Sequence, residues 1–230
     1  MKSIYLLGDS IIDNAAYVGI DEKDVESHLN SMYKEDPKVN INNRAVDGHT
    51  MRDLLDTQLS DVGLNEATHI VMSIGGNDLL QNISFLQMTS KLSEVMDKDA
   101  RIGKWGAREL NPSRNKVFEE TYFEIIKPFN SLYETIVEKL SNYRAKLLLC
   151  TVYEGDLFGS DEFENVFYSS KTMVSIFNDL VYKSSSKFKT DVLELRNIFV
   201  SSEDYANPIE PSHIGGEKLA KSIVEWVDNG

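Results

Sequence analysis

Ser3-Ile4-Tyr5-Leu6-Leu7-Gly8-Asp9-Ser10 is the stretch that decides the fold of this chain. A short run of apolar β-forming residues leads directly into Gly-Asp-Ser, and residues 11–14 are expected to form the first turn of a helix. A serine in that place lies at the carboxyl end of a strand, where open α/β sheets hold their ligands, and near the positive end of a helix dipole. A turn at Gly8 and a helix cap at Asp9 or Ser10 would explain the same residues without a site.

Four more apolar runs have the composition of strands, and helical periodicity fills the segments between them. The expected strands are Ile4–Leu7, Val39–Ala45, His69–Ile74, Ala145–Val152 and Asp191–Leu195. The expected helices lie at 25–33, 51–59, 118–140, 173–181 and 219–227, the third kinked or divided at Pro128 and the last beginning after Gly215-Gly216. This alternation predicts an α/β fold with a parallel sheet of about five strands and helices on both faces.

The composition is that of a single soluble globular domain over residues 1–230. The chain is 41% hydrophobic and 27% charged, and no linker-like stretch divides it. Its 24 Lys and Arg against 37 Asp and Glu give a net charge of −13, which disfavours nucleic acid and anionic membranes as partners. The apolar run before Asp9 is too short for a secretion signal and no stretch has the length of a membrane span, so we expect a cytoplasmic protein without stable membrane anchoring.

The single cysteine, Cys150, lies in an apolar run and is expected to be a buried core thiol. Two segments are less regular than the rest of the chain: 97–115, which could form a flap, and 153–169, which follows a predicted strand and should overhang the carboxyl edge of the sheet. The sequence leaves the oligomeric state open.

Three further fragments stand where such a sheet would bring them towards Ser10. They are 43–50 with Gly48, Gly75-Gly76-Asn77-Asp78, and Glu210-Pro211-Ser212-His213. Each has an ordinary structural explanation, because glycines suit turns, Asn and Asp suit helix caps, and an isolated histidine is more often structural than catalytic. Their combination at strand ends and in the last loop favours a site.

With these fragments in order, the sequence resembles the SGNH hydrolases, the GDSL esterase/lipase family, over nearly its whole length. Gly8-Asp9-Ser10, Gly48, Gly76-Asn77-Asp78 and Glu210-x-x-His213 match the four motifs of that family. The resemblance implies a three-layer α/β/α sandwich of flavodoxin type. It also implies Ser10 as nucleophile, His213 as base, and an oxyanion hole formed by the NH groups of Ser10 and Gly48 and the amide of Asn77. Two departures are Glu210, where the family usually has Asp, and Ile214, where a proline commonly follows the histidine.

The residue chemistry points the same way. A serine hydroxyl needs a base within hydrogen-bond reach, the intermediate needs donors such as Asn77, and the histidine needs a carboxylate that fixes its tautomer. Pro211 at the second position of a turn would bring Glu210 and His213 together, although Asp204 could be the partner instead. We therefore predict a serine esterase with a Ser10–His213–Glu210 triad, no cofactor or metal, and a small-molecule ester as substrate.

Two other functions remain open at this stage. A metal-dependent phosphoesterase would account for the Gly-Asp and Gly-Asn elements, but the four histidines of the chain lack the spacing of its ligands. A non-catalytic binding module on the same fold is the second alternative, because a fold does not fix a function.

Overall fold

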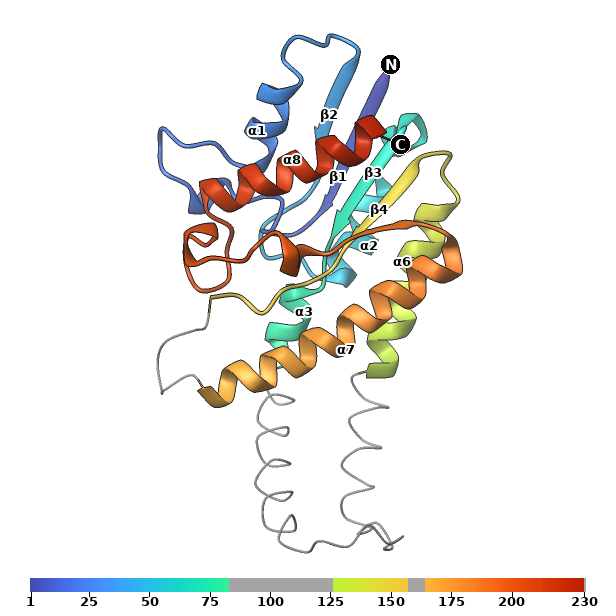
Figure 1. Ribbon diagram of the computed structural model, residues 1–230. Coiled ribbons are helices and arrows are strands. Elements are labelled where there is room, and N and C mark those ends of the chain that lie inside the picture. Colours follow the sequence, from blue (N-terminus) through green and yellow to red (C-terminus); the bar gives the residue numbers. More distant parts are fainter. Residues whose placement is uncertain (83–125, 157–163, 230) are drawn as a thin grey trace, which may run out of the picture.

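The computed structural model describes residues 1–82, 126–156 and 164–229 (Figure 1). Its centre is one parallel sheet with the strand order β2-β1-β3-β4-β5. All five predicted strands are present: β1 (Lys2–Gly8), β2 (Val39–Asn43), β3 (His69–Ser73), β4 (Lys146–Cys150) and β5 (Asp191–Leu193). The strand order reverses direction between β1 and β3, which is where an open α/β sheet forms its ligand crevice.

Strand β1 lies in the interior of the sheet, and its side chains alternate between two hydrophobic cores. Ile4 and Leu6 point into the core on one face, and Tyr5 and Leu7 point into the core on the other. Strands that are covered on both faces read as continuous apolar runs, which explains the composition of this stretch.

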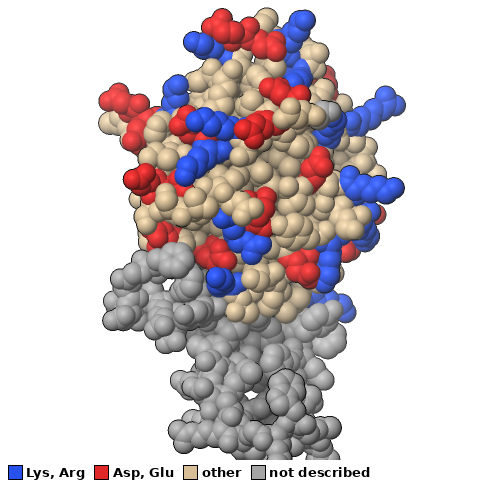
Figure 2. Space-filling view, in the orientation of Figure 1, with Lys and Arg blue, Asp and Glu red and all other residues tan. Residues whose placement is uncertain are grey.

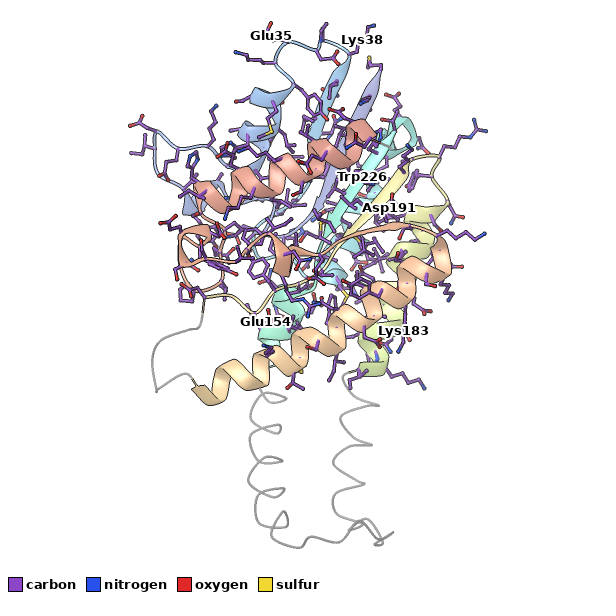
Figure 3. All side chains as sticks on the ribbon, in the orientation of Figure 1. Glu35, Lys38, Glu154, Lys183, Asp191 and Trp226 are labelled. Carbon is purple, nitrogen blue, oxygen red and sulfur yellow. The ribbon has the colours of Figure 1, made fainter. Side chains whose placement is uncertain are left out.

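Helices cover both faces of the sheet and produce three layers. On one face, α1 (Val25–Met32) packs beside α8 (His213–Asn229), as Figure 1 shows. The opposite face carries α2 (Met51–Asp56), α6 (Lys127–Ser141) and α7 (Glu164–Phe188), and the short α3 (Gly76–Gln81) follows β3. At the far edge, the Trp226 indole of α8 donates a 2.8 Å hydrogen bond to Asp191 on β5 (Figure 3). The three-layer α/β/α prediction is confirmed.

Several helix boundaries differ from the prediction. Helix α2 ends at Asp56, and α7 begins at Glu164, inside the segment 153–169 that was expected to be irregular. Residues 11–14 form a turn instead of a helix, and the next helical residues are a short 3-10 segment at Ala15–Tyr17. Helix α8 begins at His213, so Gly215 and Gly216 lie in its first turn. A Cβ on Gly215 would lie 2.2 Å from the backbone oxygen of Asp204. This glycine therefore permits close packing of α8 and does not mark the start of the helix.

Pro128 lies in the first turn of α6, where a missing NH group costs no helical hydrogen bond. The part of the predicted 118–140 helix that precedes residue 126 is outside the described residues, as is the 97–115 segment. Acidic and basic side chains are interspersed over the face shown in Figure 2. None of the helices in the described ranges combines the length and apolarity that a membrane span needs.

Candidate active site

Ser10 follows the last residue of β1, and the strand end is held by an unusually close backbone contact. Gly8 has a φ of 143°, and a Cβ there would lie 1.8 Å from the Ser73 backbone oxygen on β3. The Gln58 amide then holds both polar groups of Gly8, accepting from its NH at 2.8 Å and donating to its carbonyl at 2.7 Å. The backbone that leads into Ser10 is therefore fixed from two sides, and only glycine fits at position 8.

The turn after Ser10 is closed by Asp9. The Asp9 carbonyl accepts from the NH groups of Ile12 (3.1 Å) and Asp13 (2.9 Å), and its Oδ1 accepts from the NH of Ile11 (3.2 Å). No helix starts at residues 11–14. The prediction that Ser10 lies at the positive end of a helix dipole is therefore wrong. The serine is presented by a strand-end turn alone.

Ser10 opens into a cavity of ≈170 Å³ at the carboxyl edge of the sheet. Three polar residues from different elements line it together with the turn: Ser10, Asn77 and Glu210. The rest of its described lining is mostly apolar and includes Ile11, Leu79, Leu80, Val152, Met173, Val174 and Ile209. Glu154 also lines the cavity, beside α3 in Figure 3. The arrangement is that of a largely apolar binding site with a few convergent polar groups.

Asn77 is the second residue of α3 and does not cap that helix, whose N-cap is Gly75. Its Nδ2 donates to the His49 carbonyl at 3.0 Å, which leaves the second hydrogen of the same amide for another acceptor. The neighbouring Asp78 accepts from the NH of Met51 at 2.9 Å and ties α3 to α2. Gly48 precedes His49 with a φ of 80° but is exposed and is not among the residues that line the cavity.

Glu210 reaches the cavity from the last loop and interacts with Ser10. Glu210 is 8% exposed, and the neighbouring Ser10 side chain favours its charged form. Its Oε2 is buried with no hydrogen-bond partner among the described residues. Burial raises the pKa of Glu210, the Ser10 contact lowers it, and Asp47 raises it again, so that the pKa is raised on balance.

His213 is placed elsewhere. Its Nδ1 lies 3.1 Å from Nε2 of His28 on α1 and 3.3 Å from both the backbone nitrogen and the backbone oxygen of Lys23. It is not among the residues that line the cavity. No hydrogen bond joins the side chains of His213 and Glu210 in this structure, and the Ser10–His213–Glu210 triad stays a prediction.

The local backbone explains this separation. Residues 210–213 do not form the expected turn, because Pro211 pairs with Tyr205 in an antiparallel bridge and the Ala206 NH donates to the Glu210 carbonyl at 2.9 Å. Ser212 then caps α8, its Oγ accepting from the NH groups of Ile214 (3.1 Å) and Gly215 (3.2 Å). The expected turn is therefore replaced by an extended segment followed by the start of α8.

Asp204, the alternative partner for the histidine, is fully buried and has a different role. It accepts from the NH groups of Val200 and Ser201 and forms a 2.5 Å ion pair with Lys218 of α8. These bonds hold its pKa below the usual range despite its burial. Asp204 therefore anchors α8 to the loop before it.

Burial raises the pKa values of Asp9, which lines the cavity, and of Asp78, which follows the cavity residue Asn77. Burial raises the pKa of Asp9 to about 8, with Glu210 and Asp78 adding repulsion, and raises that of Asp78 to about 6. Asp9 Oδ2 is also buried without a partner among the described residues. At neutral pH the Asp9 carboxyl is therefore expected to be largely protonated, and less negative charge surrounds Ser10 than the sequence suggests.

Two supporting residues have no clear signal in the sequence. Gln58 belongs to a 3-10 segment (Gln58–Ser60) and lies fifty positions from the glycine that it holds. Asn14 is fully buried, donates to the Pro211 carbonyl at 3.2 Å and accepts from the Val25 NH at 2.9 Å, so it links the last loop to α1. In the described ranges, no three His, Cys, Asp or Glu side chains are grouped so as to hold a metal ion.

The comparisons with known proteins agree with this architecture. No family model matches the chain. The protein YpmR of Bacillus subtilis (strain 168), described as uncharacterized, is 23% identical over 244 residues, covering 97% of this chain and 80% of its own length.

Solved structures match the chain at low identity but over nearly its full length. The lipase/acylhydrolase from Enterococcus faecalis (17% identity, TM-score 0.61) matches 100% of this chain and 96% of its own. The acetylxylan esterase Axe2 from Geobacillus stearothermophilus (13%, 0.63) matches 97% and 93%, and the phospholipase A1 from Streptomyces albidoflavus NA297 (12%, 0.62) matches 98% of each. The chain has the fold of the SGNH hydrolases, the GDSL-type esterases and lipases.

Proposed function

We propose that the protein is a serine hydrolase that cleaves carboxylic esters of small molecules, with Ser10 as its nucleophile. The observation that carries this proposal is the position of Ser10, a residue that is 6% exposed and follows the end of β1, in a largely apolar cavity that Glu210 and Asn77 also line. The fold and the esterases among the similar structures support the same chemistry.

Within this proposal, the NH of Ser10 and the side-chain amide of Asn77 stabilise the oxyanion of the tetrahedral intermediate. The amide is held by the His49 carbonyl through one hydrogen, so that its other hydrogen is oriented before the substrate binds. The NH group of Gly48 stays a predicted third donor to the oxyanion. Gly48 does not line the cavity, but the carbonyl of the next residue, His49, accepts a hydrogen bond from Asn77.

The cavity also supports a class of substrate. An apolar cavity of about 150 Å³ accepts a molecule of the size of benzene, and the cavity beside Ser10 measures ≈170 Å³. We therefore propose that it takes a neutral acyl group of roughly six carbon atoms or fewer. A series of chromogenic esters of increasing acyl length should show kcat/KM falling beyond that length.

The first test is Ser10→Ala. The variant should retain its fold and lose ester hydrolysis, and a fluorophosphonate probe should label the wild type at Ser10 and not the variant. Ser175→Ala, which removes an exposed hydroxyl on α7, is the matched control. Undiminished turnover in Ser10→Ala would remove the proposal, and a large loss of wild-type activity in excess chelator would revive the metal-dependent alternative.

A further inference from the structure

A second, smaller cavity adjoins the Ser10 cavity and lies between α3, α6 and α7. It measures ≈20 Å³, and Leu79 and Met173 line both cavities, so these two residues stand between them. We propose that Met173 sets the length of the acyl chain that the Ser10 cavity accepts, because its side chain closes the way into the second cavity. This inference rests on the proposed ester hydrolysis and concerns the substrate class of that site.

Helix α7 places Met173 at the boundary between the two cavities. Met173 and Val174 line the Ser10 cavity, whereas the residues of α7 that line the second cavity are Met173, Ile176, Phe177 and Leu180. Positions 173, 176, 177 and 180 lie on one face of a helix. This face of α7 therefore leads from the Ser10 cavity into the second cavity, and Met173 is the residue of α7 that borders both.

The second cavity suits an alkyl chain. Helix α6 packs against α7 on this side of the sheet (Figure 1), and it contributes Phe129 and Asn130, with Ile126 just before it. Asn130 is the one polar residue in the described lining, which contains no charged residue. A charged group would be costly to bury there, whereas each methylene that enters should favour binding by roughly fourfold.

Helix α7 is held against the sheet close to Met173. The Asn178 side chain accepts from the NH of Val152 at 2.8 Å and donates to its carbonyl at 2.7 Å, just after the end of β4. Asn178 is 1% exposed, so both bonds are shielded from water. Sliding of α7 along the sheet would break them. Access to the second cavity therefore depends on side chains and not on a movement of the helix.

The Phe177 side of the second cavity is fixed, whereas Met173 can adjust. The Phe177 ring packs on Gly75, where a Cβ would lie 2.2 Å from its Cζ, and it contacts the Tyr133 ring edge-on at a centroid distance of 5.5 Å. Methionine is unbranched, and its three rotatable bonds let it fill irregular gaps. The volume of the Met173 side chain therefore determines how far an acyl chain extends from the Ser10 cavity.

The experiment compares Met173→Ala and Met173→Phe with Ile136→Ala. The control removes the same number of heavy atoms from a fully buried residue of α6 that lines neither cavity. We measure kcat/KM on even-numbered chromogenic esters from acetate to dodecanoate and the circular dichroism of each variant.

Met173→Ala should join the two cavities, because cores collapse only partly around a truncated side chain. Its kcat/KM for octanoate relative to butanoate should rise by roughly tenfold over the wild type, as two further methylenes become buried. Met173→Phe should shift the preference towards shorter chains, and Ile136→Ala should keep the wild-type profile. If Met173→Ala does not fold, Leu79→Ala, which opens the same boundary from α3, and Met173→Phe decide the question.

Binding of 1-octanol and 1-butanol tests the boundary without the reaction. A ligand of the folded state raises Tm, so octanol should raise the Tm of Met173→Ala more than that of the wild type or of Ile136→Ala. Butanol should act alike on all three proteins.

The two assays separate the failure of this inference from the failure of the proposed function. If Met173→Ala hydrolyses esters with the wild-type chain-length profile and gains no octanol binding, the ester hydrolase stands and the role of Met173 is wrong. If the wild type hydrolyses no ester while Met173→Ala gains octanol binding, the proposed function falls and Met173 still bounds the cavity.

Discussion

Asp9 is the residue whose charge the fold changes most clearly. Its pKa is about 8 in the folded state and near 3.9 in an unfolded chain. Between these values the folded protein holds one proton more than the unfolded protein. The free energy of unfolding that this group contributes is therefore complete below about pH 4 and is lost as the pH rises towards 8, by at most about 1.4 kcal/mol per pH unit.

Asp9→Asn should remove this pH dependence, because the amide cannot ionise and has nearly the shape of the protonated carboxyl group. Urea unfolding of both proteins between about pH 5 and pH 8 should show the wild type losing more stability than the variant as the pH rises. If the free energy of unfolding changed with pH in the same way in both proteins, Asp9 would already be ionised in the folded protein over this pH range.

Asn77 gives a second prediction at the scale of single residues. Loss of one oxyanion donor typically costs roughly 10²–10³-fold in kcat, so Asn77→Ala should lower kcat by that order and change KM little. Asn65→Ala, which removes an exposed amide bonded to the Val62 carbonyl, is the control. A rise in KM alone would show that Asn77 only holds the loop at His49.

At the scale of elements, the segment after β4 brings negative charge to the cavity. Glu154 lines the cavity and Asp156 follows it, while the remaining acids of 154–164 fall on residues outside the described ranges or on side chains that are not described. Like charge disfavours an anionic substrate. Under the proposed function, we therefore expect a neutral ester to be hydrolysed faster than an anionic ester of the same shape.

Glu154→Gln should lower the preference for the neutral ester over the anionic ester. The difference between variant and wild type should be largest at low salt, where charges are screened least. The measurement is the ratio of kcat/KM for a neutral ester and its anionic isostere, in wild type and variant, at two ionic strengths. Asp179→Asn changes one exposed charge on α7 and controls for net charge. An unchanged ratio in Glu154→Gln would show that the charge of Glu154 does not cause the preference.

The start of α8 is the element where sequence reasoning failed, and the reason is local. Glu210-Pro211-Ser212-His213 fits a turn by its proline, but Ser212 is also a good N-cap, and the structure uses it as one. A search for helix caps would have separated Glu210 from His213 before the structure was known.

For the molecule as a whole, the sequence predicts the architecture well. The strands β1, β3 and β4 are largely apolar because two cores, one on each face of the sheet, bury their side chains, and amphipathic helices alternate with them for the same reason. The site is predicted only in part. Ser10 and Asn77 can be predicted because they follow the ends of strands. Gln58 and Asn14 act through contacts with distant segments, and no local sequence pattern predicts such contacts.

The two hydrogen bonds between Gln58 and Gly8 affect the exchange of the Gly8 amide proton with solvent. The amide proton at Gly8 is bonded to a side chain from another segment, while amides in the middle of β1 are protected by the sheet. Deuterium uptake at Gly8 should therefore follow the opening of the 58–60 segment, and uptake at the other β1 amides should follow the opening of the sheet. Exchange at Gly8, two residues before Ser10, thus reports how often its hydrogen bond with Gln58 opens.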